Sequence, residues 1–301
     1  MQSIIEIKEL SRRFRRTRAI DNVSFDVAPG SVIGLVGENG AGKTTLIKHI
    51  LGLLRAQTGS IEVFGMNPVT HPVKVLARIG YMSENRDLPR WMRVKELIRY
   101  MSALYPGWDA VYAERLREQF GLDATAKIRT LSLGQKAKTG LLAALAHRPE
   151  LLVLDEPSSG LDPVVRRDIL GAIFRGVAEE GRTVFFSSHL LDEVESVADR
   201  VVMMHAGKVL MNGALKAILG HHCKVVVRMK NEWDKPLGFP NVIGGGRNGT
   251  DYTLLCQSTD DAVRAAAASQ PLEIVKLGRP SLDEIFVARV SLQDKARGAS
   301  V

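Results

Sequence analysis

A glycine-rich segment between an apolar stretch and a helical pattern constrains this chain more than any other feature. Residues 31–36 are mostly apolar and rich in β-branched side chains, which predicts a buried strand. Residues 45–54 carry apolar side chains at helical spacing. The segment GENGAGKT, residues 37–44, joins the two and follows the pattern Gly-x-x-x-x-Gly-Lys-Thr. A strand, this loop and a helix in that order predict a phosphate-binding loop.

The residue types of this loop suit an anion. Glycines let backbone N–H groups curl around phosphate oxygens without Cβ clashes, and the helix N-terminus adds partial positive charge. We expect Lys43 to contact the β- and γ-phosphates and the Thr44 hydroxyl to coordinate Mg²⁺. A chance glycine-rich turn is the alternative, and the flanking strand and helix speak against it. The residues expected to bind the nucleotide here are Gly37, Asn39, Gly40, Ala41, Gly42, Lys43, Thr44 and Thr45.

Two carboxylates follow a second apolar strand. Residues 151–154 are all apolar, so this strand belongs inside a sheet, and Asp155 and Glu156 come directly after it. Ligands of open α/β sheets bind at the carboxyl ends of the strands. We therefore expect Asp155 to hold Mg²⁺ and Glu156 to act as the general base toward an attacking water. The alternative is an Asp-Glu pair that only caps a helix.

The composition is that of a globular protein of 301 residues, long enough for one large domain and one small one. No apolar run reaches about 18 residues, and the N-terminal residues lack the layout of a signal peptide. The two cysteines lack metal-ligand spacing and suit a reducing cytosol, so we expect a cytoplasmic protein. The net charge of +8 is compatible with nucleic acid or anionic lipid headgroups. Its densest basic cluster, residues 12–18, is a solvated loop or lies near nucleotide phosphates or a membrane.

Strand and helix patterns alternate along the chain, which predicts an α/β core with a mainly parallel sheet. We expect a nucleotide-binding domain over residues 1–222, with a helical subdomain inserted at about 86–148. The pattern restarts as a small α+β unit over residues 223–290, with a glycine-rich loop at 244–250. Residues 291–301 are expected to be disordered.

The segment LSLGQKAKTGLLAALAHRPELLVLDEPSSGLDP, residues 131–163, resembles the ATP-binding subunit of ABC transporters. The order of motifs matches that family along roughly the first 220 residues, which implies the ABC type of P-loop NTPase fold. The family signature is usually Leu-Ser-Gly-Gly-Gln, and here Leu133 replaces the first glycine. The resemblance implies that the signature completes the ATP site of the opposite subunit in a head-to-tail dimer. The signature residues expected on ATP are Ser132, Leu133, Gly134 and Gln135.

The same resemblance implies roles for four further residues. Phe14 stands where the family stacks an aromatic ring on adenine, although it could also be a core residue at a strand end. Glu84 replaces the usual glutamine that ligates Mg²⁺ and senses the membrane partner, or it is a solvated loop acid. Asp162 lies in the loop that reaches the ATP site across the dimer interface, and His189 matches the histidine that contacts the γ-phosphate. We thus expect Lys43, Glu156 and His189 to be the catalytic residues.

The C-terminal segment RPSLDEIF, residues 279–286, is similar to a segment of multidrug and bacitracin exporter subunits. This segment favours the exporter branch of the family over importers. The family resemblance as a whole implies an ATPase that forms a homodimer, or a heterodimer with a sibling subunit, and drives a separate membrane permease from its cytoplasmic side. A soluble ABC ATPase acting on nucleic acid or ribosomes is one alternative, but those proteins usually carry two ATPase units or a long coiled coil. A non-hydrolysing regulatory module is another, which Leu133 and Glu84 leave open and which Glu156 and His189 oppose. We do not expect a nucleic-acid partner.

Overall fold

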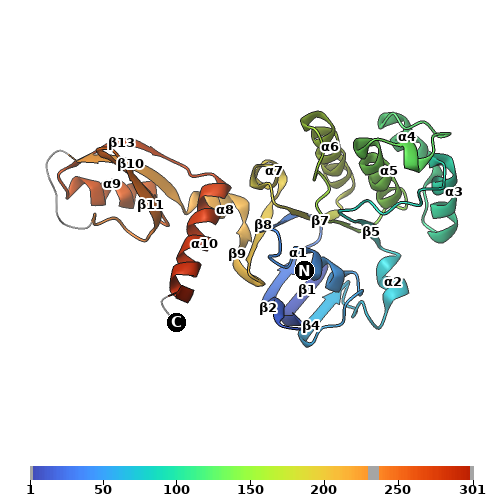
Figure 1. Ribbon diagram of the computed structural model, residues 1–301, viewed down its shortest axis with the longest axis horizontal. Helices are drawn as coiled ribbons and strands as arrows, with labels where there is room; N and C mark the ends of the chain where they lie inside the picture. The colour runs from blue at the N-terminus through green and yellow to red at the C-terminus, as the bar shows by residue number, and fades with distance from the viewer. Residues whose placement is uncertain (1–2, 230–236, 299–301) are drawn as a thin grey trace. The chain divides into compact units, whose positions relative to one another are not determined.

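The computed structural model describes residues 3–229 and 237–298 and divides them into two compact units (Figure 1). The first unit extends to Leu190 and includes Val197–Asn212. The second holds Leu191–Ser196 and the chain from Gly213 onward. No helix in these described ranges combines the length and the apolar character needed to cross a membrane.

The first unit is built on a six-stranded sheet of order β5-β6-β7-β3-β8-β9. The pairings from β5 through β8 are all parallel, which confirms the predicted mainly parallel sheet. Every residue of β3, β6 and β7 is buried, as expected for central parallel strands that are covered on both faces. The strands are β3 (Val32–Val36), β5 (Ile79–Met82), β6 (Leu151–Leu154), β7 (Thr183–Ser188), β8 (Arg200–His205) and β9 (Lys208–Ala214).

An antiparallel sheet of order β2-β1-β4 and helix α1 complete the main core. The strands are β1 (Ile5–Phe14), β2 (Thr17–Val27) and β4 (Thr58–Val63), and α1 spans Lys43–Ile50. Leu46 and Ile47 of α1 join one buried cluster with Ile7 of β1 and Phe185 of β7. The start of α1, which carries the predicted phosphate loop, is thereby fixed by apolar packing between the two sheets.

The segment between β5 and β6 contains helices and one isolated bridge. Figure 1 shows α3, α4 and α5 grouped together, and α5 contacts both of the others. Helix α6 packs on α5 and on β7, so it connects this helical region to the sheet. The helices between β4 and β8 are α2 (Pro72–Leu76), α3 (Val94–Leu104), α4 (Ala110–Gln119), α5 (Leu133–Leu145), α6 (Pro163–Glu180) and α7 (Leu191–Val197).

The second unit contains an antiparallel sheet of order β11-β12-β10-β13. Cys223 lies opposite Cys256 on neighbouring strands, and both are free, fully buried thiols. The elements of this unit are α8 (Leu215–Gly220), β10 (Cys223–Met229), β11 (Val242–Asn248), β12 (Asp251–Cys256), α9 (Asp260–Ala268), β13 (Leu272–Gly278) and α10 (Leu282–Gly298).

Three expectations for the C-terminal part need correction. The second unit begins at Gly213 rather than at residue 223, because α8 belongs to it and Arg279 donates a hydrogen bond to the Gly220 carbonyl. Residues 244–248 of the glycine-rich stretch belong to strand β11, which pairs with β12, and only residues 249–250 form a turn; a Cβ on Gly245 would lie 2.5 Å from the Thr253 oxygen. Residues 291–298 continue α10, in keeping with their good helix formers, and residues 299–301 lie outside the described chain.

Candidate active site

The loop between β3 and α1 has the backbone shape of a phosphate cradle. A Cβ on Gly37 would lie 2.4 Å from the Met204 carbonyl oxygen, and one on Gly42 would lie 2.4 Å from the Ala19 oxygen. Gly42 also has φ +107 and precedes α1 without a side-chain cap. The N–H groups of the first helical turn are therefore available to an anion at the loop.

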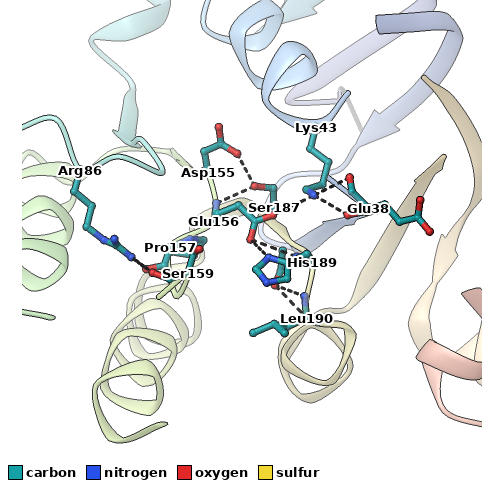
Figure 2. A network of polar contacts seen from close by, with 12 residues as sticks. Glu38, Lys43, Arg86, Asp155, Glu156, Pro157, Ser159, Ser187, His189 and Leu190 are labelled. Carbon is teal, nitrogen blue, oxygen red and sulfur yellow. Dashed lines mark hydrogen bonds and ion pairs between the residues drawn. The ribbon is translucent and has the colours of Figure 1, made fainter. Parts of the chain in front are cut away.

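Lys43 turns its ammonium group back over this loop. Its Nζ donates to the carbonyl oxygens of Gly37 at 2.6 Å and Glu38 at 3.4 Å (Figure 2). The same nitrogen lies 3.1 Å from Oε1 of Glu156, and both side chains are more than nine-tenths buried. The cation of the phosphate loop and the carboxylate expected to act on water thus form one buried ion pair.

Glu156 sits at the carboxyl end of β6 in the left-handed region, with φ +49. Its Oε2 lies 2.7 Å from Nδ1 of His189 and 3.3 Å from the His189 backbone nitrogen. Because an ionised carboxylate only accepts, the ring donates its Nδ1 proton to Glu156. The carboxylate is consequently held between Lys43 on one oxygen and His189 on the other, as Figure 2 shows.

Ser187 joins the two carboxylate positions, and the sequence interpretation missed it. The fully buried Ser187 Oγ donates to Oδ1 of Asp155 at 2.7 Å and accepts from the Glu156 backbone N–H at 2.9 Å. The register explains this contact, because Leu154 pairs with Phe186 on neighbouring parallel strands. Its sequence signal is the pair of serines that ends the apolar run of β7 directly before His189.

These residues come from three adjacent strands, β6, β7 and β3, whose carboxyl ends meet at one edge of the sheet. Two acids are buried there with a single lysine. Tyr81 on β5 lies near Asp155: burial, together with the nearby charges of Asp155 and Asp87, raises the pKa of Tyr81 to about 12. That phenol stays protonated across the physiological range.

The donor set around the loop fits Mg²⁺. The Thr44 hydroxyl and the Asp155 carboxylate offer the hard oxygen ligands that this ion prefers, and Ser187 fixes one Asp155 oxygen. Glu84 behaves differently. It is exposed in the loop after β5, and within the described residues no hydrogen bond or ion pair joins it to this cluster. Its solvated position agrees with the loop-acid alternative, and a metal role for it stays a prediction.

Phe14 lies at the end of β1, where it is 40% exposed, so it is no core residue. The Arg12 guanidinium carbon lies 4.8 Å from the centroid of its ring. An exposed aromatic ring held by a cation on one side retains a face on which a base could stack.

The signature residues form a second group at the start of α5. Ser132 caps this helix: its Oγ accepts from the Gln135 N–H at 3.2 Å, while Gln135 Oε1 accepts from the Ser132 N–H at 2.9 Å. The Leu133 side chain is 47% exposed. Oδ1 of Asp162 accepts the Val164 and Val165 N–H groups at the start of α6, a capping role the sequence interpretation did not include. Ser132, Leu133, Gly134, Gln135 and Asp162 line one cavity of about 410 Å³.

A phosphate loop at the end of a central parallel strand, with an Asp-Glu pair on the next but one strand, defines a P-loop nucleotide-binding protein. The family model described as "ABC transporter" matches residues 20–159. The ABC transporter ATP-binding protein YtrB of Bacillus subtilis is 27% identical over 286 residues, which are 95% of this chain and 98% of YtrB. The bacitracin transport ATP-binding protein BcrA of Bacillus licheniformis is 34% identical, over 70% of this chain and 69% of BcrA. NatA of Bacillus subtilis, another ABC transporter ATP-binding protein, is 34% identical over 71% of this chain and 91% of NatA.

Solved structures give the same result. One ATP-binding subunit of an ABC transporter is 30% identical, with a TM-score of 0.66, over 72% of this chain and 92% of that one. The MJ0796 cassette, solved as a post-hydrolysis dimer with ADP and Pi, shares the fold at 20% identity, with a TM-score of 0.64 over 70% and 98% of the two chains. This chain belongs to the family of ABC transporter ATP-binding proteins, whose activity is ATP hydrolysis coupled to transport. The resemblance and the fold class expected from the sequence are confirmed.

Proposed function

We propose that the chain is the MgATP-hydrolysing subunit of an exporter, that it works as a dimer, and that it drives a separate membrane permease. The observation that carries the catalytic part is the convergence of Lys43, Asp155, Glu156 and His189 at the carboxyl ends of three neighbouring strands. Lys43, Asp155 and Glu156 are buried, whereas the His189 side chain is 40% exposed. Groups of both signs held in a fixed mutual orientation are what phosphoryl transfer requires, since its catalysis is mostly positioning and electrostatics.

In this mechanism the loop N–H groups and Lys43 bind the β- and γ-phosphates. Thr44 and Asp155 would hold Mg²⁺, which when bound neutralises charge on the phosphate oxygens. Ser187 keeps the Asp155 carboxylate in one orientation through its 2.7 Å hydrogen bond. Phe14 stacks on the adenine ring.

Glu156 is the general base. The attacking water gives a proton to the Glu156 carboxylate as its oxygen bonds to the γ-phosphorus, and the bond from that phosphorus to the bridging oxygen breaks to leave ADP. Binding of the triphosphate draws the Lys43 ammonium from Oε1 of Glu156, which exposes that oxygen to water. His189 holds Oε2 through its Nδ1 proton, and its other ring nitrogen is available to the γ-phosphate.

The second half of each site comes from the other subunit. The N-terminus of α5, with the Ser132 hydroxyl and the Gly134 N–H, is suited to an anion, and Asp162 lines the same cavity. When two chains associate head to tail, the N-terminus of α5 comes to lie against the γ-phosphate of the ATP that is bound at Lys43 of the partner subunit. The dimer of the MJ0796 cassette supports this arrangement by its fold. The partner is a second copy or a sibling subunit.

The exporter assignment rests on relatives. BcrA is named for bacitracin transport, and YtrB matches this chain over nearly its whole length, C-terminal unit included. The helical region exposes large apolar side chains, which suits docking to a permease at the cytoplasmic face of the membrane. They are Tyr100, Leu104 and Val111, with Trp91 just before α3.

Two experiments test the proposal. The purified chain should hydrolyse ATP only with Mg²⁺, and Lys43→Ala should abolish ATP binding. A tagged chain solubilised from its native membrane should co-purify with an integral membrane protein, and that complex should hydrolyse ATP faster than the chain alone. Recovery with ribosomes or nucleic acid instead, sensitive to nuclease, would contradict the transporter assignment.

A further inference from the structure

Arg86 is a buried cation just outside the predicted catalytic cluster. It lies in the loop after β5, and a φ of +51 turns it away from its neighbours. Asn85 and Asp87 on either side are exposed, whereas Arg86 is only 8% exposed. The sequence alone offers no reason why one arginine of this polar loop should point inward.

The Arg86 guanidinium contacts the turn that follows Glu156. Its Nη2 donates to the carbonyl oxygen of Ser159 at 2.5 Å and approaches that of Pro157 at 3.4 Å (Figure 2). The Ser159 N–H donates in turn to the Glu156 carbonyl at 3.2 Å. The Arg86 side chain, from the loop after β5, thus forms hydrogen bonds to the backbone turn that begins at Glu156, the predicted general base.

Burying the Arg86 charge costs free energy that a residue serving only to fill space would not require. Burial lowers the pKa of Arg86, which shows that its charge has lost hydration, and the nearby Glu84 charge offsets only part of this. Among the described residues no carboxylate forms an ion pair with it, and its Nε has no hydrogen-bond partner. An apolar side chain would occupy this place at lower cost, so the donors of the guanidinium are the property that matters here.

The backbone of the turn after Glu156 requires stabilising hydrogen bonds. Glu156 occupies the left-handed region with φ +49, a conformation that persists in a non-glycine residue only when its surroundings enforce it. Ser187 holds the Glu156 N–H from one side, and the Arg86–Ser159 contact holds the following turn from the other.

We propose that Arg86 is a positioning residue for ATP hydrolysis: it fixes the Pro157–Ser159 turn and thereby keeps the Glu156 carboxylate between Lys43 and His189. The inference rests on the proposed function, because it assumes that Glu156 is the base. It also ties the loop that carries Glu84 to the turn that carries the base, so that the two move together.

The test is Arg86→Met in the full chain, which keeps the length of the side chain and removes its donors. We expect kcat to fall by about 10- to 100-fold, the effect of a slightly misplaced catalytic group, with the Kd for ATP changed by less than about twofold. Arg90→Met is the matched control, since Arg90 is exposed in the same loop, and its kcat should equal that of the wild type. Methylguanidinium added to Arg86→Ala should restore part of the lost kcat and should leave Arg90→Ala unchanged.

Wild-type kcat in Arg86→Met, or an equal loss of ATP affinity and kcat, would overturn the inference. If Arg86→Met does not fold, Arg86→Lys replaces it, because lysine keeps the cation and cannot span both carbonyls. A lower kcat at unchanged Kd then supports the inference, and wild-type kcat overturns it. Glu156→Gln distinguishes failure of the proposed function from failure of the role of Arg86. If the wild type hydrolyses ATP no faster than Glu156→Gln, the proposed function is refuted. If Glu156→Gln is inactive and Arg86→Met is fully active, only the role of Arg86 is refuted.

Discussion

Nζ of Lys43 lies 3.1 Å from Oε1 of Glu156, so the cation expected on the phosphates and the base expected to act on water neutralise each other inside the protein. Neither group can take up its role without releasing the other. The triphosphate would compete for Lys43, so we expect substrate binding to be coupled to release of the proposed base.

Glu156→Gln should separate binding from chemistry. The amide keeps the shape of the side chain but cannot take a proton from water, so hydrolysis should slow by at least about 10²-fold. ATP should still bind, because Lys43, Thr44 and Asp155 remain and the competing carboxylate charge is gone. Size-exclusion chromatography with MgATP should show an accumulated dimer, whereas the wild type returns to monomer as ATP is consumed. Glu62→Gln, an exposed change on β4, is the control. Hydrolysis at the wild-type rate would remove Glu156 as the base.

Ser187→Ala should damage stability and catalysis together. The change leaves the buried Glu156 N–H and Asp155 Oδ1 without their serine partner, which should lower the free energy of unfolding by about 1–3 kcal/mol. Half-maximal ATPase activity should also need more Mg²⁺, because Asp155 is no longer oriented. Urea titration and a Mg²⁺ titration measure the two effects. Ser102→Ala, which removes an exposed hydrogen bond to Arg99, should stay within about 0.5 kcal/mol of the wild type. An unchanged Mg²⁺ requirement would refute the orienting role.

Phe14→Ala should weaken ATP binding by about 1–3 kcal/mol, the scale of a stack between a base and an aromatic ring. The fold should stay intact, since the ring is 40% exposed. Calorimetric titration with ATP measures the affinity, and Trp91→Ala, an exposed aromatic of the helical region, is the matched control. Equal affinities in the two variants would exclude Phe14 from the site.

Leu133→Gly restores the commoner signature. The exposed leucine stands at the first position of α5, beside the anion-binding end of the helix. If it limits the approach to the partner's γ-phosphate, ATP turnover should rise, or dimerisation should need less ATP. Leu133→Ala separates loss of side-chain bulk from added backbone freedom. A fall in both turnover and dimerisation would mean that Leu133 is a packed part of the interface.

His147 should make stability depend on pH. Burial lowers the pKa of His147, whose Nε2 lies 3.1 Å from the Ile79 carbonyl oxygen and whose ring stacks on Tyr105. As the pH falls below about 6.5, His147 becomes protonated in the unfolded chain but stays neutral in the folded chain. The free energy of unfolding should therefore decrease, by at most about 1.4 kcal/mol per pH unit for this group. Urea titrations at pH 7.5 and 5.5 measure the slope. His147→Gln, which retains a donor, should flatten it, and exposed His71→Gln should not. Equal slopes in all three proteins would refute the assignment.

The parts of the site that could be predicted are those encoded in local patterns. The phosphate loop follows from glycines between a strand and a helix, and Asp155 follows from an acidic end on an apolar strand. Ser187 and Arg86 could not be found in this way, because their importance comes from neighbours 31 and 73 residues away. Strand β11 could not be predicted either, because glycine has low strand propensity and only the pairing with β12 and the crowding around Gly245 explain this strand. The roles of Phe14, Glu84 and the signature residues stay predictions.

The cap on α5 bears on the energetics of assembly. Ser132 Oγ accepts the Gln135 N–H within a single chain, so the helix end that we propose to contact the partner's nucleotide is already ordered before two subunits associate. Association of the subunits would then cost little conformational entropy at that surface. A larger part of the free energy of ATP binding would therefore be available to change the conformation of a bound membrane protein. Because Oγ is the acceptor in this cap, its own hydroxyl proton is still free to be given to an incoming phosphate oxygen. In the proposed dimer, each monomer would therefore bring this helix end already ordered, and the nucleotide would supply the negative charge that it lacks.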